Sequence, residues 1–260
     1  MKNEITISVV TATWNSVNFV SDCMNSVSQQ DYKKYEHVIV DGASTDGTVE
    51  LISKYLGPKS KLCSEPDGGI YDAFNKGIGL STGEVIGFLN ADDFYASSNA
   101  LTQIAEAFKD PTVCAVFGDL EYVKQQDTSV IVRRWKGNQF NIRDLVYGWM
   151  PAHPTFYVRR EWYDLIGGFD ASYKISADYF SMLKLFSHLD FKTKYIPYCL
   201  VKMRLGGASN KSLNMLLRKS IEDWRALRSS GNGLASSILT LACKNTRKIP
   251  QFIKSNSRIK

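Results

Sequence analysis

Residues 84–93 read Glu-Val-Ile-Gly-Phe-Leu-Asn-Ala-Asp-Asp, an apolar run of strand length that stops at a polar, acidic turn. Two similar arrangements precede it: residues 5–10 lead into a polar turn at residues 11–16, and residues 35–40 end at Asp41-Gly42. Stretches with the apolar spacing of a helix lie between these runs, over residues 19–29, 48–55 and 70–80. Short strands that alternate with helices predict right-handed β-α-β units and a mostly parallel, Rossmann-like sheet flanked by helices.

The second half of the chain has a less regular pattern. Besides a short third strand over residues 61–64 in the first half, helices are expected over residues 101–108, 162–166 and 177–189, and strands over residues 113–117, 120–124, 130–134, 191–196 and 199–203. The strands at 120–124 and 130–134 should pair as an antiparallel hairpin, so a small antiparallel sheet is expected beside the parallel one. Beyond Ser212 the sequence becomes basic and helical.

Composition narrows the class of protein. The chain has 260 residues, 44% hydrophobic and 22% charged, which excludes a disordered or collagen-like protein. The net charge is +6, but eleven lysines and arginines against two acids from Lys211 onward leave +9 there and −3 in residues 1–210. Five scattered cysteines without a C-x-x-C pair argue against a disulfide scaffold and favour a reducing, cytoplasmic setting. No signal-peptide pattern is seen, and the apolar stretch 234–243 is shorter than the about 20 residues that span a bilayer.

Acidic residues follow the expected strands. Because the carboxyl ends of parallel strands meet at one edge of a sheet, the turns at Asp41 and Asp92-Asp93 should lie at the same edge. A single aspartate in such a turn is more often a helix cap, and Asp46 is interpreted in that way. Two adjacent carboxylates repel each other, and a divalent cation relieves this repulsion, so Asp92 and Asp93 favour a Mg²⁺ or Mn²⁺ site.

These motifs resemble those of glycosyltransferase family 2, enzymes of the GT-A fold, in the type that builds bacterial surface polysaccharides. The resemblance rests on the order and spacing of four segments, residues 9–15, 38–48, 65–78 and 83–93. It continues more faintly through His153-Pro154, Gly167–Asp170 and Ser176–Tyr179, and covers about residues 4–210. A GT-A domain over residues 1–210 is therefore expected, with a nucleotide-binding half (1–95), an acceptor-binding half (96–210) and a basic helical extension (211–260).

The resemblance implies roles for individual residues. The nucleotide, typically with a uracil base, would be held by Thr11, Ala12, Thr13, Asn15, Asp41, Asp67 and the Asn90-Ala91-Asp92 segment. Asp92 would bind Mn²⁺ or Mg²⁺, with Asp93 and His153 as further candidates. A loop from Arg204 to Ser209 would close over the diphosphate. Asp178 would be the catalytic base, and Asn75 is expected to brace the site from behind.

These roles fit the chemistry of sugar transfer. Displacement of a nucleoside diphosphate builds negative charge on the leaving phosphate, which a cation at Asp92 would neutralise. The attacking hydroxyl must lose a proton, which Asp178 can accept. In-line displacement with one base inverts the anomeric configuration, and the acceptor would be a glycan or a lipid-linked sugar rather than a nucleic acid.

Two alternatives for function remain open at this point. A nucleotidyltransferase shares the sheet and the acidic metal site, but it should carry a Gly-rich loop with a basic residue after the first strand, and residues 11–17 have neither. A non-catalytic scaffold that keeps the fold is the other alternative, which the presence of Asp92 and Asp178 disfavours.

The basic extension also has two interpretations. Apolar residues at helical spacing (Leu213, Leu216, Leu217, Ile221 and Trp224) alternate with basic ones. Such helices either pack on the core or lie on the anionic inner face of a membrane.

Overall fold

The computed structural model describes residues 4–141, 143–206, 213–231 and 233–246. Its strands are β1 (Ile7–Thr13), β2 (Tyr35–Asp41), β3 (Ser60–Ser64), β4 (Val85–Phe88), β5 (Phe94–Tyr95), β6 (Ala115–Val123), β7 (Ile131–Trp135), β8 (Tyr157–Arg159) and β9 (Thr193–Arg204). The helices are α1 (Val20–Ser28), α2 (Thr48–Ser53), α3 (Ile70–Leu80), α4 (Ala100–Ala107), α5 (Arg143–Val146), α6 (Arg160–Ile166), α7 (Ala177–Phe186), α8 (Leu213–Ser229) and α9 (Leu234–Thr246), with a 3₁₀ turn at His153–Thr155.

The strands of the described residues form one mixed sheet in the order β3-β2-β1-β4-β8-β6-β9-β5, with β7 beside β6. The first four strands pair in parallel, as the alternation of strands and helices predicts. The hairpin expected between residues 120–124 and 130–134 is present as β6 and β7. The antiparallel part is not a separate small sheet, however, because β8 pairs with β4 and continues the parallel sheet.

Two expected pairs of strands are single long strands. Residues 113–124 contain one strand, β6, and residues 191–204 contain one strand, β9, which pairs with β6 in parallel along its length. The register shifts at Gly118 and Asp119, where Gly118 packs so closely on Leu200 that an added Cβ would lie 2.7 Å from its side chain. This irregularity interrupts the apolar pattern without ending the strand. β5, β8 and α5 are only two to four residues long, too short for periodicity to reveal them.

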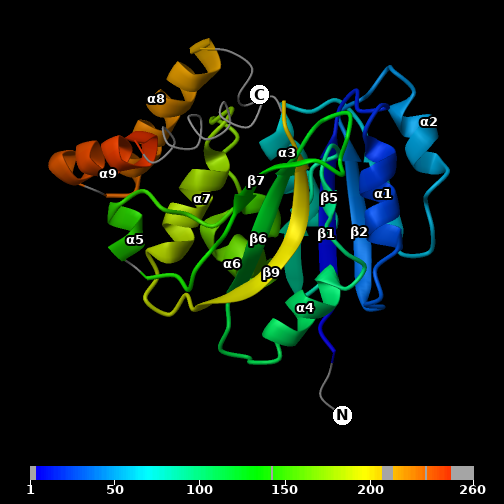
Figure 1. The fold of residues 1–260 in the computed structure, drawn as a ribbon, viewed down its shortest axis with the longest axis horizontal. Coiled ribbons are helices and arrows are strands. Elements are labelled where there is room, and N and C mark those ends of the chain that lie inside the picture. Colours follow the sequence, from blue (N-terminus) through cyan, green and yellow to red (C-terminus); the bar gives the residue numbers. More distant parts are fainter. Residues whose placement is uncertain (1–3, 142, 207–212, 232, 247–260) are drawn as a thin grey trace.

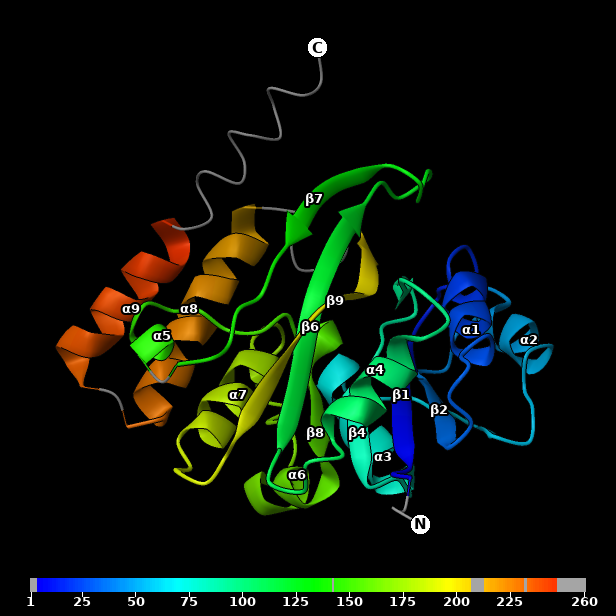
Figure 2. The ribbon, with the colours of Figure 1, turned by 60° about the horizontal axis from the view of Figure 1, so that its bottom comes forward.

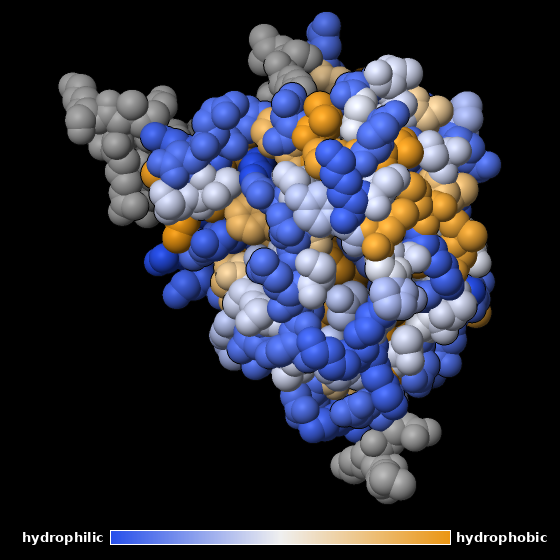
Figure 3. All heavy atoms as spheres, turned by 90° about the vertical axis from the view of Figure 1, so that its right-hand side faces the viewer, coloured by the Kyte–Doolittle hydropathy of each residue, from blue (hydrophilic) through white to orange (hydrophobic). Residues whose placement is uncertain are grey.

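Apolar side chains alternate across the sheet and form two core layers. On one face, Val10 and Ala12 of β1 join a cluster with α3 and α7. On the other face, Ile7 and Val9 join a cluster with α1 and α4. Figure 1 shows α1 and α2 at one end of the molecule and α8 and α9 at the opposite end. The end with α1 and α2 is mostly hydrophilic, with hydrophobic side chains gathered in a few patches (Figure 3).

The C-terminal helices pack against α5 and α7. α8 lies beside α7, and α9 lies beside α8 and α5 (Figure 2). Ala226 and Leu227 of α8 are buried in the same cluster as α3 and α7. The described part of the extension is therefore joined to the core, as one of the two interpretations of its sequence expects.

A buried carboxylate connects the strands of the parallel sheet. Glu36 of β2 accepts hydrogen bonds from Ser8 Oγ of β1 (2.7 Å) and from the N–H groups of Thr82 and Gly83 before β4, and it pairs with Lys61 of β3 at 2.8 Å. Burial alone would raise the pKa of Glu36, but Lys61 and these donors outweigh it and lower the pKa from about 4.5 to about 2.

We expect Glu36→Gln to lower the free energy of unfolding at pH 7 by about 1–3 kcal/mol, because the charged acceptor of several buried donors is lost. A depressed pKa stabilises the fold above the unfolded-state value near 4.5, and this contribution is lost as the pH falls toward 2. The variant should therefore lose less stability than the wild type on acidification in that window, measured by urea unfolding. Glu65→Gln, which changes an exposed acid paired with Lys76, is the control. Equal acid sensitivity of Glu36→Gln and wild type would contradict this role.

Candidate active site

The carboxyl ends of β1, β2, β3 and β4 meet at one edge of the sheet. Thr13 lies opposite Asp41 in the β1–β2 pair, and Asp41 lies opposite Ser64 in the β2–β3 pair. On the other side of β1, the N–H of Leu89 just after β4 donates to the carbonyl of Val10. The turns that carry Asp41 and Asp92 therefore share this edge, as the parallel pairing requires.

Asp41 is fully buried, and its carboxylate already accepts several hydrogen bonds. Its carboxylate accepts hydrogen bonds from Ser44 Oγ (2.5 Å), the Ser44 N–H (2.9 Å) and Ser64 Oγ (2.7 Å). A carboxylate has about four acceptor positions, so these three bonds leave room for one more donor.

Asp67 lies directly against this turn. A Cβ added to Gly42 would lie 2.7 Å from Asp67 Oδ2, so glycine is needed there for the carboxylate to approach. The other oxygen, Oδ1, accepts the N–H of Gly69 at 2.8 Å. The structure thus brings Asp41 and Asp67 together, although they are 26 residues apart in the sequence.

In the first turn, the side chain of Thr11 does not face the edge of the sheet. The Thr11 side chain points into the core, where Oγ1 lies 2.9 Å from His37 Nε2, and the strand alternation keeps it away from the edge. A ligand could reach Thr11 only through its main chain, and Ala12 is also buried. Thr13 Oγ1 is buried without a hydrogen-bond partner in the described part of the chain. Asn15, at φ 48°, binds the next turn through Ser44 Oγ and the Thr45 N–H.

In the Asp92-Asp93 turn the two carboxylates have different surroundings. Asp93 is fully buried, where it accepts from Asn90 Nδ2 (3.1 Å) and the Arg204 N–H (3.3 Å). Burial and the charge of Asp92 raise the pKa of Asp93 well above its usual range. Asp92 is half-buried at the strand end, so of the two it is the carboxylate that a ligand at this edge could reach. The Asn90 amide, predicted to help hold the nucleotide, donates to Asp93.

Arg204 is bound to the Asp92-Asp93 turn by hydrogen bonds. It is the last residue of β9, not the first residue of a loop, because β9 continues to pair with β6 up to the Arg204–Val123 position. Its Nη1 donates to the Asp92 carbonyl (2.7 Å), its Nη2 contacts Asp22, and the guanidinium lies between the rings of Phe19 and Phe94. This buried side chain holds the Asp92-Asp93 turn in place. Ser209, also predicted for the diphosphate loop, lies outside the described residues.

Among the described residues, no three His, Cys, Asp or Glu side chains cluster as a metal cage. A half-buried carboxylate such as Asp92 still suits Mg²⁺ or Mn²⁺ that arrives with a diphosphate, because such ions often take one or two protein carboxylates and fill their shell with phosphate and water.

His153 lies in an aromatic cluster. Its ring is within 6 Å of the rings of Phe74, Phe88 and Phe169, and Nε2 is buried without a hydrogen-bond partner in the described structure. Burial lowers the pKa of His153, and the charge of Asp178 counteracts this only in part. The ring is therefore on the Asp178 side of the site, and its contact with a metal or diphosphate stays a prediction.

Asp178 is half-buried in the first turn of α7 and is held by α3. The Tyr71 hydroxyl of α3 lies 3.2 Å from Asp178 Oδ1 and 2.5 Å from the Ile175 carbonyl, and the Tyr179 N–H donates to the same Oδ1 at 2.8 Å. Burial and the nearby Asp178 carboxylate raise the pKa of Tyr71 well above its usual range, so its hydroxyl keeps its proton.

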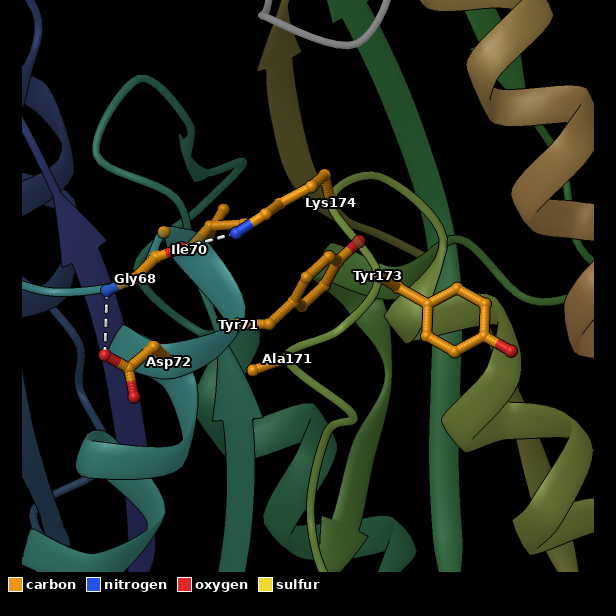
Figure 4. Close-up of a pocket in the computed structure, with 8 residues that line it drawn as sticks. Gly68, Ile70, Tyr71, Asp72, Ala171, Tyr173 and Lys174 are labelled. Carbon is orange, nitrogen blue, oxygen red and sulfur yellow. Dashed lines mark hydrogen bonds between the residues drawn. The ribbon is translucent and has the colours of Figure 1, made fainter.

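The loop before α7 is tied to the loop before α3. Lys174 Nζ reaches across a small pocket to the Gly68 carbonyl at 2.9 Å, and the Gly68 N–H donates to Asp72 (Figure 4). Asn75 braces the middle of α3 through paired hydrogen bonds with the main chain of Phe169, as expected from the sequence. α3 therefore connects the Asp67 turn to Asp178. The sequence motifs assign no role to Tyr71 or Lys174. Tyr71 lies within the segment 65–78, and Lys174 lies just before the segment Ser176–Tyr179.

We expect Arg204→Met to lower the free energy of unfolding by about 2 kcal/mol, because the stem volume is kept while hydrogen bonds of a charged group are lost. Asp22→Asn removes only its half-exposed partner and should cost less than about 1 kcal/mol. Urea unfolding of both variants measures this difference. Equal losses would show that the Asp92 carbonyl contact contributes little.

In open α/β sheets, ligands bind at the carboxyl ends of the parallel strands, and here acidic turns gather at that edge. The sequence pattern described as "Glycosyl transferase family 2" matches residues 8–175, more than half of the chain. The chain therefore belongs to glycosyltransferase family 2, has the GT-A fold and is a glycosyltransferase, which sets aside the nucleotidyltransferase alternative. The matched segment ends three residues before Asp178.

Relatives and solved structures agree with this family. The chain is 29% identical over 211 residues to a PGL/p-HBAD biosynthesis glycosyltransferase of Mycobacterium tuberculosis, covering 78% of each chain. It is also 29% identical to the chondroitin synthase of Pasteurella multocida over 71% of this chain and 20% of that protein. The fold is similar to S. aureus TarS 1-349 in complex with UDP-GlcNAc (TM-score 0.71, 16% identity, 98% of this chain and 76% of that one). It is also similar to the Pyrobaculum calidifontis mannosyltransferase PcManGT in complex with GDP-Man and Mn²⁺ (TM-score 0.66, 20% identity, 93% and 69%).

Proposed function

We propose that this glycosyltransferase moves a sugar from a UDP-sugar to a hydroxyl group of a glycan or lipid-linked acceptor, with inversion at the anomeric carbon and with a divalent cation. The observation that carries the proposal is the pairing of the acidic edge of the sheet with Asp178 through α3 and Tyr71. The helix α3 thus lies in contact with both the Asp67 turn, on the proposed donor side, and Asp178, the proposed base.

The donor would lie along the edge formed by the first four strands. Asp41 has an acceptor position left for a ring N–H, Thr13 Oγ1 has no partner among the described residues, and Asp67 lies beside Asp41. TarS, which shares the fold, was solved in complex with UDP and with UDP-GlcNAc, and this supports a uridine donor.

Asp92 would hold Mn²⁺ or Mg²⁺ against the donor diphosphate, which neutralises the charge that builds on the leaving group. The fold neighbour crystallised with Mn²⁺ supports this cofactor. Asp93 and Arg204 would act by keeping the turn in shape, since both are buried.

Asp178 would accept the proton of the attacking hydroxyl. Among the described residues the contacts of this carboxylate with the Tyr71 hydroxyl and the Tyr179 N–H are both at Oδ1, so Oδ2 is left for the acceptor. The acceptor oxygen bonds to the anomeric carbon as the bond to the diphosphate oxygen breaks, and the proton passes to Oδ2. A single displacement with one base inverts the anomeric configuration.

The setting proposed is the synthesis of a bacterial surface polysaccharide or glycolipid, which the names of the mycobacterial and Pasteurella relatives support. In the described part of the chain, no helix combines the length and apolar character needed to cross a bilayer.

The C-terminal helices expose an apolar and basic surface suited to an anionic membrane. Leu217 and Ile221 of α8 are 64% and 67% exposed and share one helix face with Arg218, Arg225 and Arg228. On α9 the usual arrangement is reversed: Ser237 and Thr240 are buried, while Leu234, Ile238 and Leu239 are exposed. Apolar side chains flanked by arginines favour peripheral binding at the inner, anionic leaflet.

The test of catalysis uses two substitutions. Asp178→Asn should reduce transfer at least about 100-fold because the base is lost, while UDP with Mn²⁺ still raises the melting temperature. Asp92→Asn should lose that Mn²⁺-dependent stabilisation by UDP. UDP release and thermal shift measure both, with Asp164→Asn, an exposed acid on α6, as control. Transfer at the wild-type rate by Asp178→Asn and Asp92→Asn would contradict the proposal and favour a scaffold.

The test of membrane binding replaces exposed residues only. Leu217→Ser with Ile221→Ser should release the protein from phosphatidylglycerol vesicles in a flotation assay, with little change in melting temperature because both side chains are exposed. Vesicles of phosphatidylcholine alone are the control for charge. Equal flotation of variant and wild type, or equal binding to both lipids, would contradict this surface.

A further inference from the structure

We propose that Glu222, on the C-terminal helix α8, is a positioning residue for the catalytic base. It would hold the Lys174–Ser176 loop and, through it, Asp178, so that the C-terminal helices complete the active site. The inference rests on the proposed role of Asp178 and concerns a helix that lies beyond the family-matched segment, residues 8–175.

The Glu222 carboxylate receives three consecutive main-chain N–H groups. Its Oε2 accepts from Ile175 (2.8 Å) and Ser176 (3.0 Å), and the Lys174 N–H lies 3.1 Å from both carboxylate oxygens. These donors come 46 to 48 residues earlier in the chain than Glu222. Figures 1 and 2 show α8 lying beside α7, which begins at Ala177 directly after this loop.

This carboxylate accepts the main-chain N–H groups that lead directly into α7. Ser176 precedes the first residue of α7, and no side chain of its own caps that helix. A helix start leaves main-chain N–H groups without partners, and a negative charge there is favourable. Burial alone would raise the pKa of Glu222, but the loop N–H groups and Arg218 outweigh it and keep the pKa below its usual value.

The same loop is held from the donor side. The Ile175 carbonyl accepts from Tyr71, and Lys174 Nζ donates to the Gly68 carbonyl. Glu222 contacts this loop from the side of α8. Asp178 follows the last residue of the loop, Ser176, by two positions. If the loop shifts, Asp178 moves relative to the donor edge, and a displacement of about 1 Å can cost about 100-fold in rate.

α8 is itself anchored, so Glu222 is a fixed support. Asp223, the next residue, is buried and pairs with Lys244 of α9 at 2.9 Å, and Arg218 lies 3.3 Å from Glu222 Oε1 on the exposed side. The two acids of the otherwise basic extension thus both have structural partners: Glu222 binds the loop before α7, and Asp223 binds α9.

The experiment compares Glu222→Gln with Leu227→Ala. Glutamine keeps the shape but replaces one acceptor oxygen with an NH₂ group facing the loop, whereas Leu227→Ala removes a buried apolar side chain of the same helix from the core. Turnover is followed as UDP release from whichever of UDP-glucose, UDP-galactose or UDP-GlcNAc the wild type uses. UDP affinity in Mn²⁺ and amide hydrogen exchange of residues 171–179 are measured in parallel.

Glu222→Gln should lower kcat about 10- to 100-fold with unchanged UDP affinity, and speed exchange of the Ile175 and Ser176 amides. Leu227→Ala should lower the melting temperature at least as much while leaving kcat within about threefold. Because both residues act on one loop, the kcat losses of Glu222→Gln and Tyr71→Phe should not add in the double variant.

Two outcomes separate this inference from the proposed function. If Asp178→Asn is inactive but Glu222→Gln keeps the wild-type kcat, or if Leu227→Ala loses as much kcat as Glu222→Gln at equal loss of stability, the positioning role is wrong. If Asp178→Asn itself retains full turnover, the proposed base is wrong, and the role of Glu222 falls with it.

Discussion

The parallel pairing of β1 with β2 on one side and β4 on the other is the constraint on which the site depends. Parallel strands present their carboxyl ends at one edge, so the turns after them meet there whatever their distance in the sequence. Asp41, Asp67 and Asp92 reach the same edge for this reason. The contact between Tyr71 and Asp178 then brings in a residue from the second half of the chain.

Three buried charged side chains stabilise this arrangement, each at a different place in the fold. Glu36 joins β1, β2, β3 and the start of β4, Arg204 supports the Asp92-Asp93 turn, and Glu222 supports the loop before Asp178. Each binds main-chain groups or side chains far away in sequence. A buried ion whose hydrogen bonds are satisfied costs less than one left unpaired, and it specifies a single geometry for the groups it binds.

How far the sequence predicts this structure depends on the range of the interactions. α3 was predicted with its correct bounds because its apolar spacing is local, and the shared edge of Asp41 and Asp92 follows from strand order alone. The inward direction of the Thr11 side chain is not predicted, because the resemblance names a segment, whereas strand alternation decides which side chains face the edge of the sheet. The fixed position of Arg204 and the contacts of Glu222 depend on pairings across more than 40 residues, which no local pattern encodes. The only hint was compositional: Glu222 and Asp223 are the two acids in a basic extension.

In the proposed arrangement one sheet edge binds the donor while α3 holds Asp178 beside it. The most direct measurement is a crystal structure of the full chain with UDP and Mn²⁺. We expect uracil next to Asp41, the cation on Asp92, and Asp178 still in contact with Tyr71 and facing the open side of the diphosphate. A nucleotide bound elsewhere, or an Asp178 carboxylate turned away from it, would contradict this arrangement.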